Sequence, residues 1–218
     1  MKLAIRLDRR AIAWARKWMT RRSVSIPRTG ETELHQMPGL LTRHGQRRFY
    51  VTEKLDGFSF SVGRIGGQFV ASTRDRMIED GDSTVFGRAV WELDLRGVPL
   101  PEGWIIQGEL CGPKIRGNKL NLDRLQLFVF DIVTPEGFLG IYAVAAFCDR
   151  FGLRTVPVLA RELVVTDACL LALAAARSVL YADTEREGAV FRAEDGASDP
   201  VFGRVSFKVF NPAFPHVA

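Results

Sequence analysis

The sequence predicts an α+β fold in which antiparallel β-sheets are flanked by a few helices. Several short segments alternate apolar and polar residues, which is the pattern of strands that bury one face. Helical patterns lie between some of these segments but do not follow every strand in the regular way that a parallel sheet requires. Because 218 residues suffice for one sizeable core and are short for two, we expect a single domain over residues 1–218.

The first 48 residues predict a basic helix followed by loops. Apolar residues recur at helical spacing in MKLAIRLDRRAIAWARKWMTRRS, and arginines and lysines fill positions between them. The next stretch, SVSIPRTGETELHQMPGLLTRHGQRR, is rich in turn-forming and basic residues, which favours loops. We expect the helix to pack against the domain, and its charge leaves an RNA-facing or targeting role open as the alternative.

A strand and a hairpin are expected next, in FYVTEKLDGFSFSV and FSFSVGRIGGQFVASTR. Residues two apart on a strand point the same way, so Lys54 and Asp56 are expected to share one face. Two alternating runs meet at Gly66 and Gly67, which is typical of a β-hairpin.

The middle of the chain predicts a short helix and two further strands. The helical pattern lies in TVFGRAVWELDL, and the strands lie in WIIQGELCG and LQLFVFDIV. On the second of these strands, alternation places Phe128, Phe130 and Ile132 on one face and Asp131 on the other.

The last third predicts two helices and three extended segments. IYAVAAFCDRFGL reads as a buried helix closed by Gly152, and TDACLLALAAARSVLYAD as a helix capped by Thr166 or Asp167. TVPVLARELVV is expected to be extended, and EGAVFR and RVSFKVF to be strands joined by the loop AEDGASDP.

Composition bounds the compartment and the partners. No apolar run approaches the ~20 residues that cross a bilayer, and the N-terminus lacks the apolar core of a secretory signal, so no membrane association is expected. The widely spaced Cys111, Cys148 and Cys169 argue against a disulfide framework or a zinc site, which favours a reducing cytoplasm. A net charge of +5 permits a polyanionic partner.

Five motifs, the last of them a pair of short segments, place polar groups where they can converge on a nucleotide. In EKLDG, Lys54 becomes a nucleophile if burial and nearby cations lower its pKa. The alternative is a surface ion pair between Lys54 and Asp56, which contributes little to the stability of the fold. The other motifs have ordinary alternatives too: a solvated arginine, an exposed strand-end glutamate and a core phenylalanine. The functional candidates in them are Arg74 in ASTRD, Glu109 in GELCGPKIRGNKL, Phe130 in LFVFDI, Glu187 in EGAVFR and Lys208 in SFKVFN.

Taken in order, EKLDG, STRD, GELCGPKIRGN, FVFDI, EGAVFR and FKVFN resemble the covalent nucleotidyltransferase superfamily of polynucleotide ligases and mRNA capping enzymes. The third motif is most similar to that of ATP-dependent RNA ligases of the RNA ligase 2 group. The resemblance covers about residues 49–214 and implies the adenylation-domain fold.

This resemblance implies an RNA ligase that uses ATP and Mg²⁺ or Mn²⁺. Lys54 would attack the α-phosphorus of ATP, and the AMP would pass to a 5′-phosphate of RNA, from which a 3′-hydroxyl displaces it. A nicked duplex stays open as one form of the acceptor. Asp56 and Lys208 would assist catalysis, and Glu187 and Asp56 would hold the metal ion. Phe130 would stack on adenine, and Phe128 is the alternative stacking residue. The implied nucleotide-binding residues are Glu53, Ser59, Arg74, Glu109, Phe130, Asp131, Glu187 and Lys208.

Three departures from the family pattern qualify what the resemblance implies. Ser59 stands where relatives often have asparagine, and Phe210 stands where a second lysine is usual. No OB-fold or C-terminal RNA-binding domain is expected, which leaves open a protein partner that replaces it. We therefore expect a minimal ligase that captures free 5′-phosphate ends weakly. The alternatives are an ATP-dependent DNA ligase, another lysine nucleotidyltransferase, or a non-catalytic module that binds RNA ends.

Overall fold

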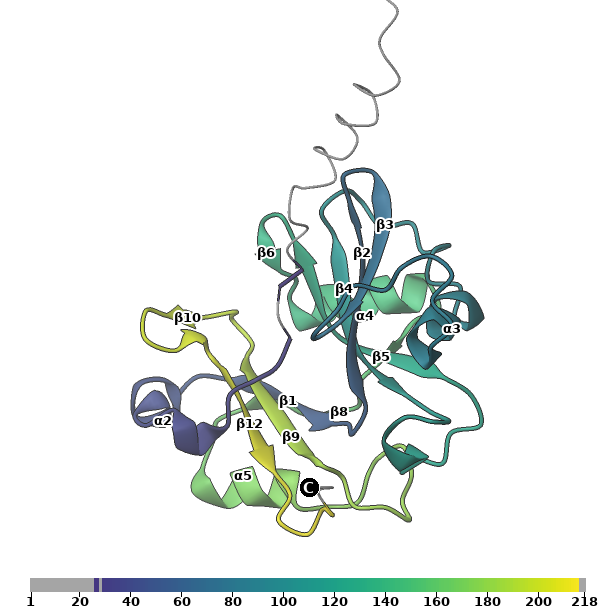
Figure 1. Ribbon diagram of the computed structural model, residues 1–218. Coiled ribbons are helices and arrows are strands. Elements are labelled where there is room, and N and C mark those ends of the chain that lie inside the picture. The colour runs from purple at the N-terminus through teal and green to yellow at the C-terminus, as the bar shows by residue number, and fades with distance from the viewer. Residues whose placement is uncertain (1–25, 28, 216–218) are drawn as a thin grey trace, which may run out of the picture.

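Two β-sheets form the framework of the computed structural model, which describes residues 26–27 and 29–215 (Figure 1). The helix predicted within residues 1–25 lies outside this part of the chain. The smaller sheet has the strand order β12-β9-β1-β8. Its strands are β1 (Phe49–Lys54), β8 (Val158–Leu163), β9 (Gly188–Ala193) and β12 (Ser206–Phe210).

The larger sheet has the strand order β3-β2-β4-β5-β6, and β7 pairs with β5 off this path. Its strands are β2 (Phe58–Ile65), β3 (Gln68–Thr73), β4 (Ile105–Cys111), β5 (Gln126–Thr134), β6 (Gly137–Phe138) and β7 (Arg154–Thr155). A small hairpin pairs β10 (Ser198–Asp199) with β11 (Gly203–Arg204). Apart from the parallel β5–β7 contact, the pairings in the described chain are antiparallel between named strands, which confirms the predicted α+β class.

Each sheet buries one face under helices. Phe60, Val62 and Ile106 of the larger sheet pack with residues of α3 (Val85–Glu92) and α4 (Ile141–Arg150). Phe191 and Phe207 of the smaller sheet pack with residues of α5 (Asp167–Ala174). Figure 1 shows α5 against the lower, smaller sheet and α4 against the upper, larger one. The opposite faces of the two sheets are therefore left to line a site between them.

The predicted hairpin at Gly66 and Gly67 is confirmed, since both glycines have positive φ and β2 pairs with β3 around them. Helix α4 is also confirmed, and Gly152 follows it with φ 67°. Thr166 caps α5, as one of the two predicted alternatives.

Two predictions of helix and loop extent are wrong. The helix expected over residues 166–183 ends at Ala174, because the buried side chain of Arg186 donates to the carbonyls of Leu173 and Arg177 and replaces further helical turns. The region predicted as loops contains the short elements η1 (Leu34–Gln36) and α2 (Leu40–His44). His44 is the last residue of α2, and its contact with Asp199 fixes this end of the helix. The contact joins His44 Nε2 and Asp199 Oδ2 at 2.9 Å.

A further single-turn helix, η2 (Arg116–Asn118), lies in the glycine-rich stretch after β4. Among the helices of the described chain, we find no segment with the length and hydropathy of a membrane span.

Candidate active site

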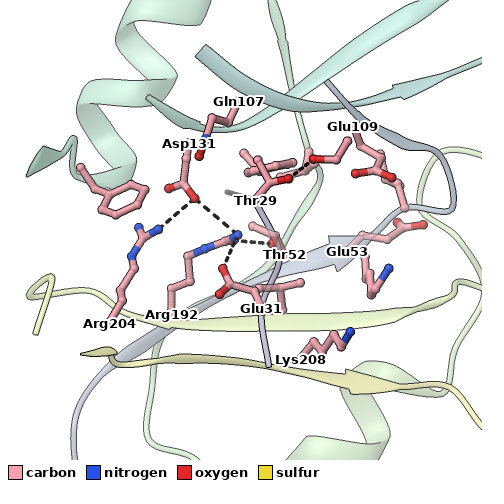
Figure 2. Close-up of a pocket in the computed structure, with 18 of the residues that line it drawn as sticks. Thr29, Glu31, Thr52, Glu53, Gln107, Glu109, Asp131, Arg192, Arg204 and Lys208 are labelled. Atoms are coloured by element: carbon pink, nitrogen blue, oxygen red, sulfur yellow. Dashed lines mark hydrogen bonds and ion pairs between the residues drawn. The ribbon is translucent and has the colours of Figure 1, made fainter. Parts of the chain in front are cut away.

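A cavity of about 260 Å³ lies between the two sheets, lined by residues from strands of both (Figure 2). Eight of the ten predicted site residues line it. These are Glu53, Lys54, Ser59, Arg74, Glu109, Phe130, Asp131 and Lys208. The remaining two do not line the cavity: Glu187 contacts Lys54, and Asp56 pairs with Lys119.

Lys54 is the last residue of β1 and points to the carboxylate of Glu187, the residue directly before β9. In the register of β1 with β9, Lys54 lies opposite Gly188, so Glu187 is adjacent, and Lys54 Nζ donates to Glu187 Oε2 at 2.5 Å. A side chain at Gly188 would meet the carbonyl of Val209 at 2.2 Å, so only glycine permits this close approach of β9 and β12. The lysine side chain is 22% exposed, which leaves it accessible from the cavity.

Asp56 does not share a face with Lys54, so this prediction is wrong. Strand β1 ends at Lys54, and the alternation on which the prediction rests stops there. The Asp56 carboxylate lies 2.9 Å from Lys119 Nζ and 4.0 Å from Arg116 Nε. Asp56 does not belong to the described residues that line the cavity. Its geometry supports a structural ion pair that anchors the stretch after β4.

Glu109 faces the cavity from β4, opposite Ser59 of β2. It accepts a hydrogen bond from the backbone amide of Gly57 at 3.2 Å. A side chain at Gly57 would lie 2.4 Å from the carbonyl of Leu110, so glycine allows the turn after Lys54 to approach β4. Burial, and then the negative charge of Glu187, raise the pKa of Glu109 to about 7 against the lowering effects of Lys54, Gly57 and Arg74.

Glu109→Gln is expected to stabilise the protein at alkaline pH. Because the pKa of Glu109 rises from 4.5 to about 7 on folding, its contribution to stability is fully present below pH 4.5 and is lost as the pH rises through about 7. At pH 8 the variant should exceed the wild type in free energy of unfolding by about 3 kcal/mol, an order-of-magnitude figure, and at pH 4 the gain should vanish. Urea unfolding at both pH values, without divalent metal, measures this.

Glu92→Gln is the matched control, because Glu92 forms an exposed pair with Arg88 on α3 and should change stability by less than about 1 kcal/mol. A Glu109→Gln variant that is less stable than the wild type at pH 8 would show that the carboxylate is not destabilised by its surroundings.

Lys208 supplies a second ammonium group to the cavity. It lies opposite Val190 in the register of β12 with β9. Burial, and then the positive charge of Lys54, lower the pKa of Lys208. The ring of Phe210 accommodates both cations, since its centroid lies 4.7 Å from Lys208 Nζ and 5.4 Å from Lys54 Nζ. The residue that replaces the usual second lysine therefore contacts both lysines.

Phe130 and Asp131 both line the cavity, which corrects the prediction that they occupy opposite faces of β5. The pairing of β4 with β5 shifts by one residue between Gln107, opposite Asp131, and Gly108, opposite Val129. Phe130 is the extra residue of this β-bulge, and a bulge re-aims the side chains around it. Phe128, the predicted competitor for stacking, is buried in a cluster with Leu55 and residues of neighbouring loops.

Sequence reasoning missed an ion network at one side of the cavity. Arg192 of β9 lies 2.7 Å from a carboxylate oxygen of Glu31 and 3.7 Å from Asp131 Oδ2. Arg204 donates to the same Asp131 oxygen at 2.8 Å. Figure 2 shows Asp131, Arg192 and Arg204 gathered on one side and Glu53 and Glu109 on the other. Arg192 was detectable, since it lies two residues after Val190 in EGAVFR and shares its face.

The segment before η1 crosses between the sheets and brings Glu31 into this network. Gln107 Nε2 donates to the carbonyl of Pro27 at 2.7 Å, and the hydroxyls of Thr29 and Ser59 are hydrogen-bonded. Ser206 Oγ donates to Glu31 Oε2 at 2.7 Å on the smaller sheet. This segment lies in a stretch that the sequence predicted only as loop, and it carries no motif that would place it in the site.

The comparisons with known proteins agree with this geometry. The family model described as RNA ligase matches residues 47–210, which is most of the chain. No curated protein sequence matches. Among solved structures, RNA ligase from Naegleria gruberi with pyrophosphate is 26% identical, with a TM-score of 0.74, over 86% of this chain and 56% of that one.

Structures of mutants of the same Naegleria gruberi enzyme are also similar to this chain. One, with ATP and Mn, is 24% identical with a TM-score of 0.74, over 86% of this chain and 57% of that one. Another, with AMP and Mn, is 23% identical with a TM-score of 0.73, over 86% of this chain and 56% of that one. This chain thus spans a little over half the length of the solved chains. By the extent of the family match, it belongs to the RNA ligase family.

Proposed function

We propose that the chain is the nucleotidyltransferase domain of an ATP-dependent RNA ligase in which Lys54 carries the AMP. The observation that carries this proposal is the position of Lys54 Nζ at the cavity, 2.5 Å from Glu187, with Lys208 lining the same cavity from β12, on the far side of β9. Complexes of the Naegleria gruberi ligase with ATP, with AMP and with pyrophosphate support ATP as the donor and pyrophosphate as the leaving group.

The first step forms a bond between Lys54 Nζ and the α-phosphorus while the bond to pyrophosphate breaks. The amine must be unprotonated to attack, and Glu187 Oε2 already accepts its hydrogen bond, so the departing proton has an acceptor. Lys208 and Arg74 line the same cavity and supply positive charge for the phosphate oxygens. Positioning and charge neutralisation are the main requirements of phosphoryl transfer.

The nucleoside part of ATP fits the remaining lining. Phe130 of the larger sheet and Val190 of the smaller one both line the cavity and would cover the two faces of the base. Glu109, which faces the cavity from β4 of the larger sheet, would accept hydrogen bonds from ribose hydroxyls. Glu53 has less freedom, because its carboxylate already accepts from the Val179 amide at 2.8 Å.

The residues fit a divalent metal that is held largely by substrate phosphates. The described part of the chain has no group of three or more His, Cys, Asp or Glu side chains that would bind a metal unaided. Glu187 keeps a second carboxylate oxygen, and its charge already raises the pKa of Glu109, so a cation here would relieve repulsion. Asp56 is a poor ligand because it is paired with Lys119. When bound, Mg²⁺ or Mn²⁺ would neutralise phosphate charge.

The acceptor that we propose is RNA with a 5′-phosphate and a 3′-hydroxyl, at the ends of strands or at a nick in a duplex. The family and the excess of basic residues support a nucleic-acid substrate. A protein partner that strengthens RNA binding is part of this proposal. So is a reducing cytoplasm, since Cys111, Cys148 and Cys169 are all free thiols.

Sealing of nicked duplexes tests the proposed acceptor. Full-length protein with ATP and Mg²⁺ is expected to join a 5′-phosphorylated nick whose 3′-hydroxyl end is RNA, and to join an all-DNA nick much more slowly. Equal sealing of both nicks would favour a DNA ligase. Failure to seal even a pre-adenylylated RNA nick would favour a non-catalytic module that binds RNA ends.

Phe210→Lys is expected to increase the sealing of 5′-phosphorylated nicks by about 10-fold or more, because it adds a cation for phosphate oxygens beside Lys208. Pre-adenylylated nicks, which bypass the reaction with ATP, should gain less. The ratio of the two rates under identical conditions is the measurement.

Phe210→Leu is the control for this prediction, since it removes the ring without adding charge and should not raise the rate. A Phe210→Lys variant whose rate ratio equals that of the wild type would show that the missing lysine does not limit the first step.

A further inference from the structure

Two exposed aromatic rings beside the larger sheet are each stacked with an arginine from another part of the fold. The guanidinium carbon of Arg204, in β11, lies 4.1 Å from the ring centroid of Phe138, in β6. That of Arg161, in β8 of the smaller sheet, lies 5.2 Å from the ring centroid of Tyr142, in α4. Phe138 and Tyr142 remain 47% and 60% exposed, so each ring keeps surface for a further stacking partner. We call these four residues the stacking ridge.

The stacking ridge begins at the rim of the cavity and continues outside it. Phe138 and Arg204 belong to the cavity lining, whereas Tyr142 and Arg161 lie outside the described lining. Phe138 and Tyr142 are only four residues apart in the chain, so the outer pair lies close to the inner pair. Figure 1 shows β6 and the β10–β11 hairpin on the same side of the molecule.

The outer end of the ridge is set apart from the nucleophile. Arg161 directly follows Ala160, which lies opposite Val51 in the register of β8 with β1. Lys54 is three residues beyond Val51, so roughly 10 Å of strand separates the two positions. A polymer that enters from this side passes the ridge before its end reaches the cavity.

The ridge has the chemistry that binds unpaired bases. Aromatic rings and guanidinium planes both stack on the bases of single strands, whereas the bases of a duplex are already stacked on one another. The two cations differ, because Arg204 is paired with Asp131 and Arg161 has no ion pair among the described residues. The charge of Arg161 is therefore available to a phosphate.

Net charge does not explain how the larger part of the chain would hold RNA. Residues 1–25 contain eight of the 30 Lys and Arg residues and one of the 25 Asp and Glu residues. Residues 26–218 therefore contain 22 basic and 24 acidic residues, a net charge of −2. Without a general positive field, this part of the chain is expected to hold RNA largely through stacking and single phosphate contacts.

We propose that the stacking ridge binds a single-stranded RNA segment next to the end that is joined, an inference that rests on the ligase function proposed above. One base stacks on the open face of Tyr142 and a neighbouring base on Phe138, while Arg161 contacts the phosphate backbone. A strand whose last nucleotides are unpaired is therefore bound more tightly than the same strand in a duplex.

Equilibrium binding to the full chain tests this inference, with a 5′-phosphorylated single-stranded RNA and with the same strand in a blunt duplex, both followed by fluorescence anisotropy. Tyr142→Ala is expected to weaken binding of the single strand by about 10-fold or more, and binding of the duplex by much less. Tyr142→Phe keeps the ring and should retain the wild-type affinity. Arg161→Gln should reduce the slope of log affinity against log salt concentration by about 0.7, the value of one phosphate contact.

Trp91→Ala is the matched control. Trp91 is 69% exposed and is stacked with Arg96 at 5.7 Å, but it lies on α3 and does not belong to the described cavity lining. Its variant should bind the single strand like the wild type. An unchanged affinity in Tyr142→Ala, an equal loss in Trp91→Ala, or an equal loss for single strand and duplex would overturn the inference.

Formation of the AMP adduct in the absence of RNA separates this inference from the proposed function. Tyr142→Ala should form the adduct at the wild-type rate, because Tyr142 lies outside the described cavity lining. RNA affinity that depends on Tyr142, in a protein that forms no adduct, would uphold the ridge and contradict the ligase. Adduct formation in a protein whose RNA affinity does not depend on Tyr142 would do the reverse.

Discussion

Lys54→Arg is expected to abolish the transfer of AMP from ATP, by at least about 1,000-fold, and to retain sealing of pre-adenylylated RNA. Arginine keeps the positive charge and the pairing with Glu187, but its guanidinium stays protonated and is no nucleophile. In the proposed reaction the last step uses the 3′-hydroxyl as nucleophile and does not need the amine. Rates of sealing 5′-phosphorylated and pre-adenylylated nicks, measured side by side, separate the two steps.

Lys119→Arg is the matched control for this experiment. Lys119 is as buried as Lys54 and also pairs with a carboxylate, that of Asp56 at 2.9 Å, yet it does not belong to the described cavity lining. Its variant should seal both substrates at rates close to those of the wild type. Equal loss of both activities in Lys54→Arg would mean that the substitution damages the fold and not the nucleophile.

Lys208→Ala is expected to slow the reaction with ATP by about 100- to 1,000-fold, because it removes a preorganised cation from phosphate oxygens in a partly enclosed site. Arg74 is another cation among the described residues that line the cavity, but Phe210 stands beside Lys208 where the resemblance to the family places a second lysine. Single-turnover formation of the AMP adduct at saturating ATP measures this effect on chemistry.

Lys208→Arg should recover a large part of the rate, because the charge remains on β12. Lys114→Ala is a suitable comparison, since Lys114 carries the same charge outside the lining of the described cavity. If Lys208→Ala forms the adduct at the wild-type rate, the phosphate charge is neutralised elsewhere.

Elements that depend on local pattern could be predicted from the sequence. Alternation gave the hairpin around Gly66 and Gly67, and helical spacing gave α3 and α4. The end of α5 could not be predicted, because alanines favour helix and the competing interaction is made by Arg186, which lies outside the predicted helix. The bulge at Phe130 likewise depends on the register between two strands.

The candidate site was predictable where a motif carries it. Lys54, Glu109 and Lys208 lie in short motifs whose order indicates the family, and all three line the cavity. Asp56 was misplaced because strand alternation was extended beyond the end of β1. Glu31 could not be found, since its role depends on contacts with residues more than 150 positions away.

The mass of the intact protein after incubation with ATP and Mg²⁺, followed by peptide mapping, tests the role of Lys54 most directly. A gain of one AMP is expected, linked by an acid-labile nitrogen–phosphorus bond to the peptide that contains Lys54, and absent from Lys54→Arg. An AMP on any other residue, or no gain with either Mg²⁺ or Mn²⁺, would contradict the assignment of Lys54 as the nucleophile.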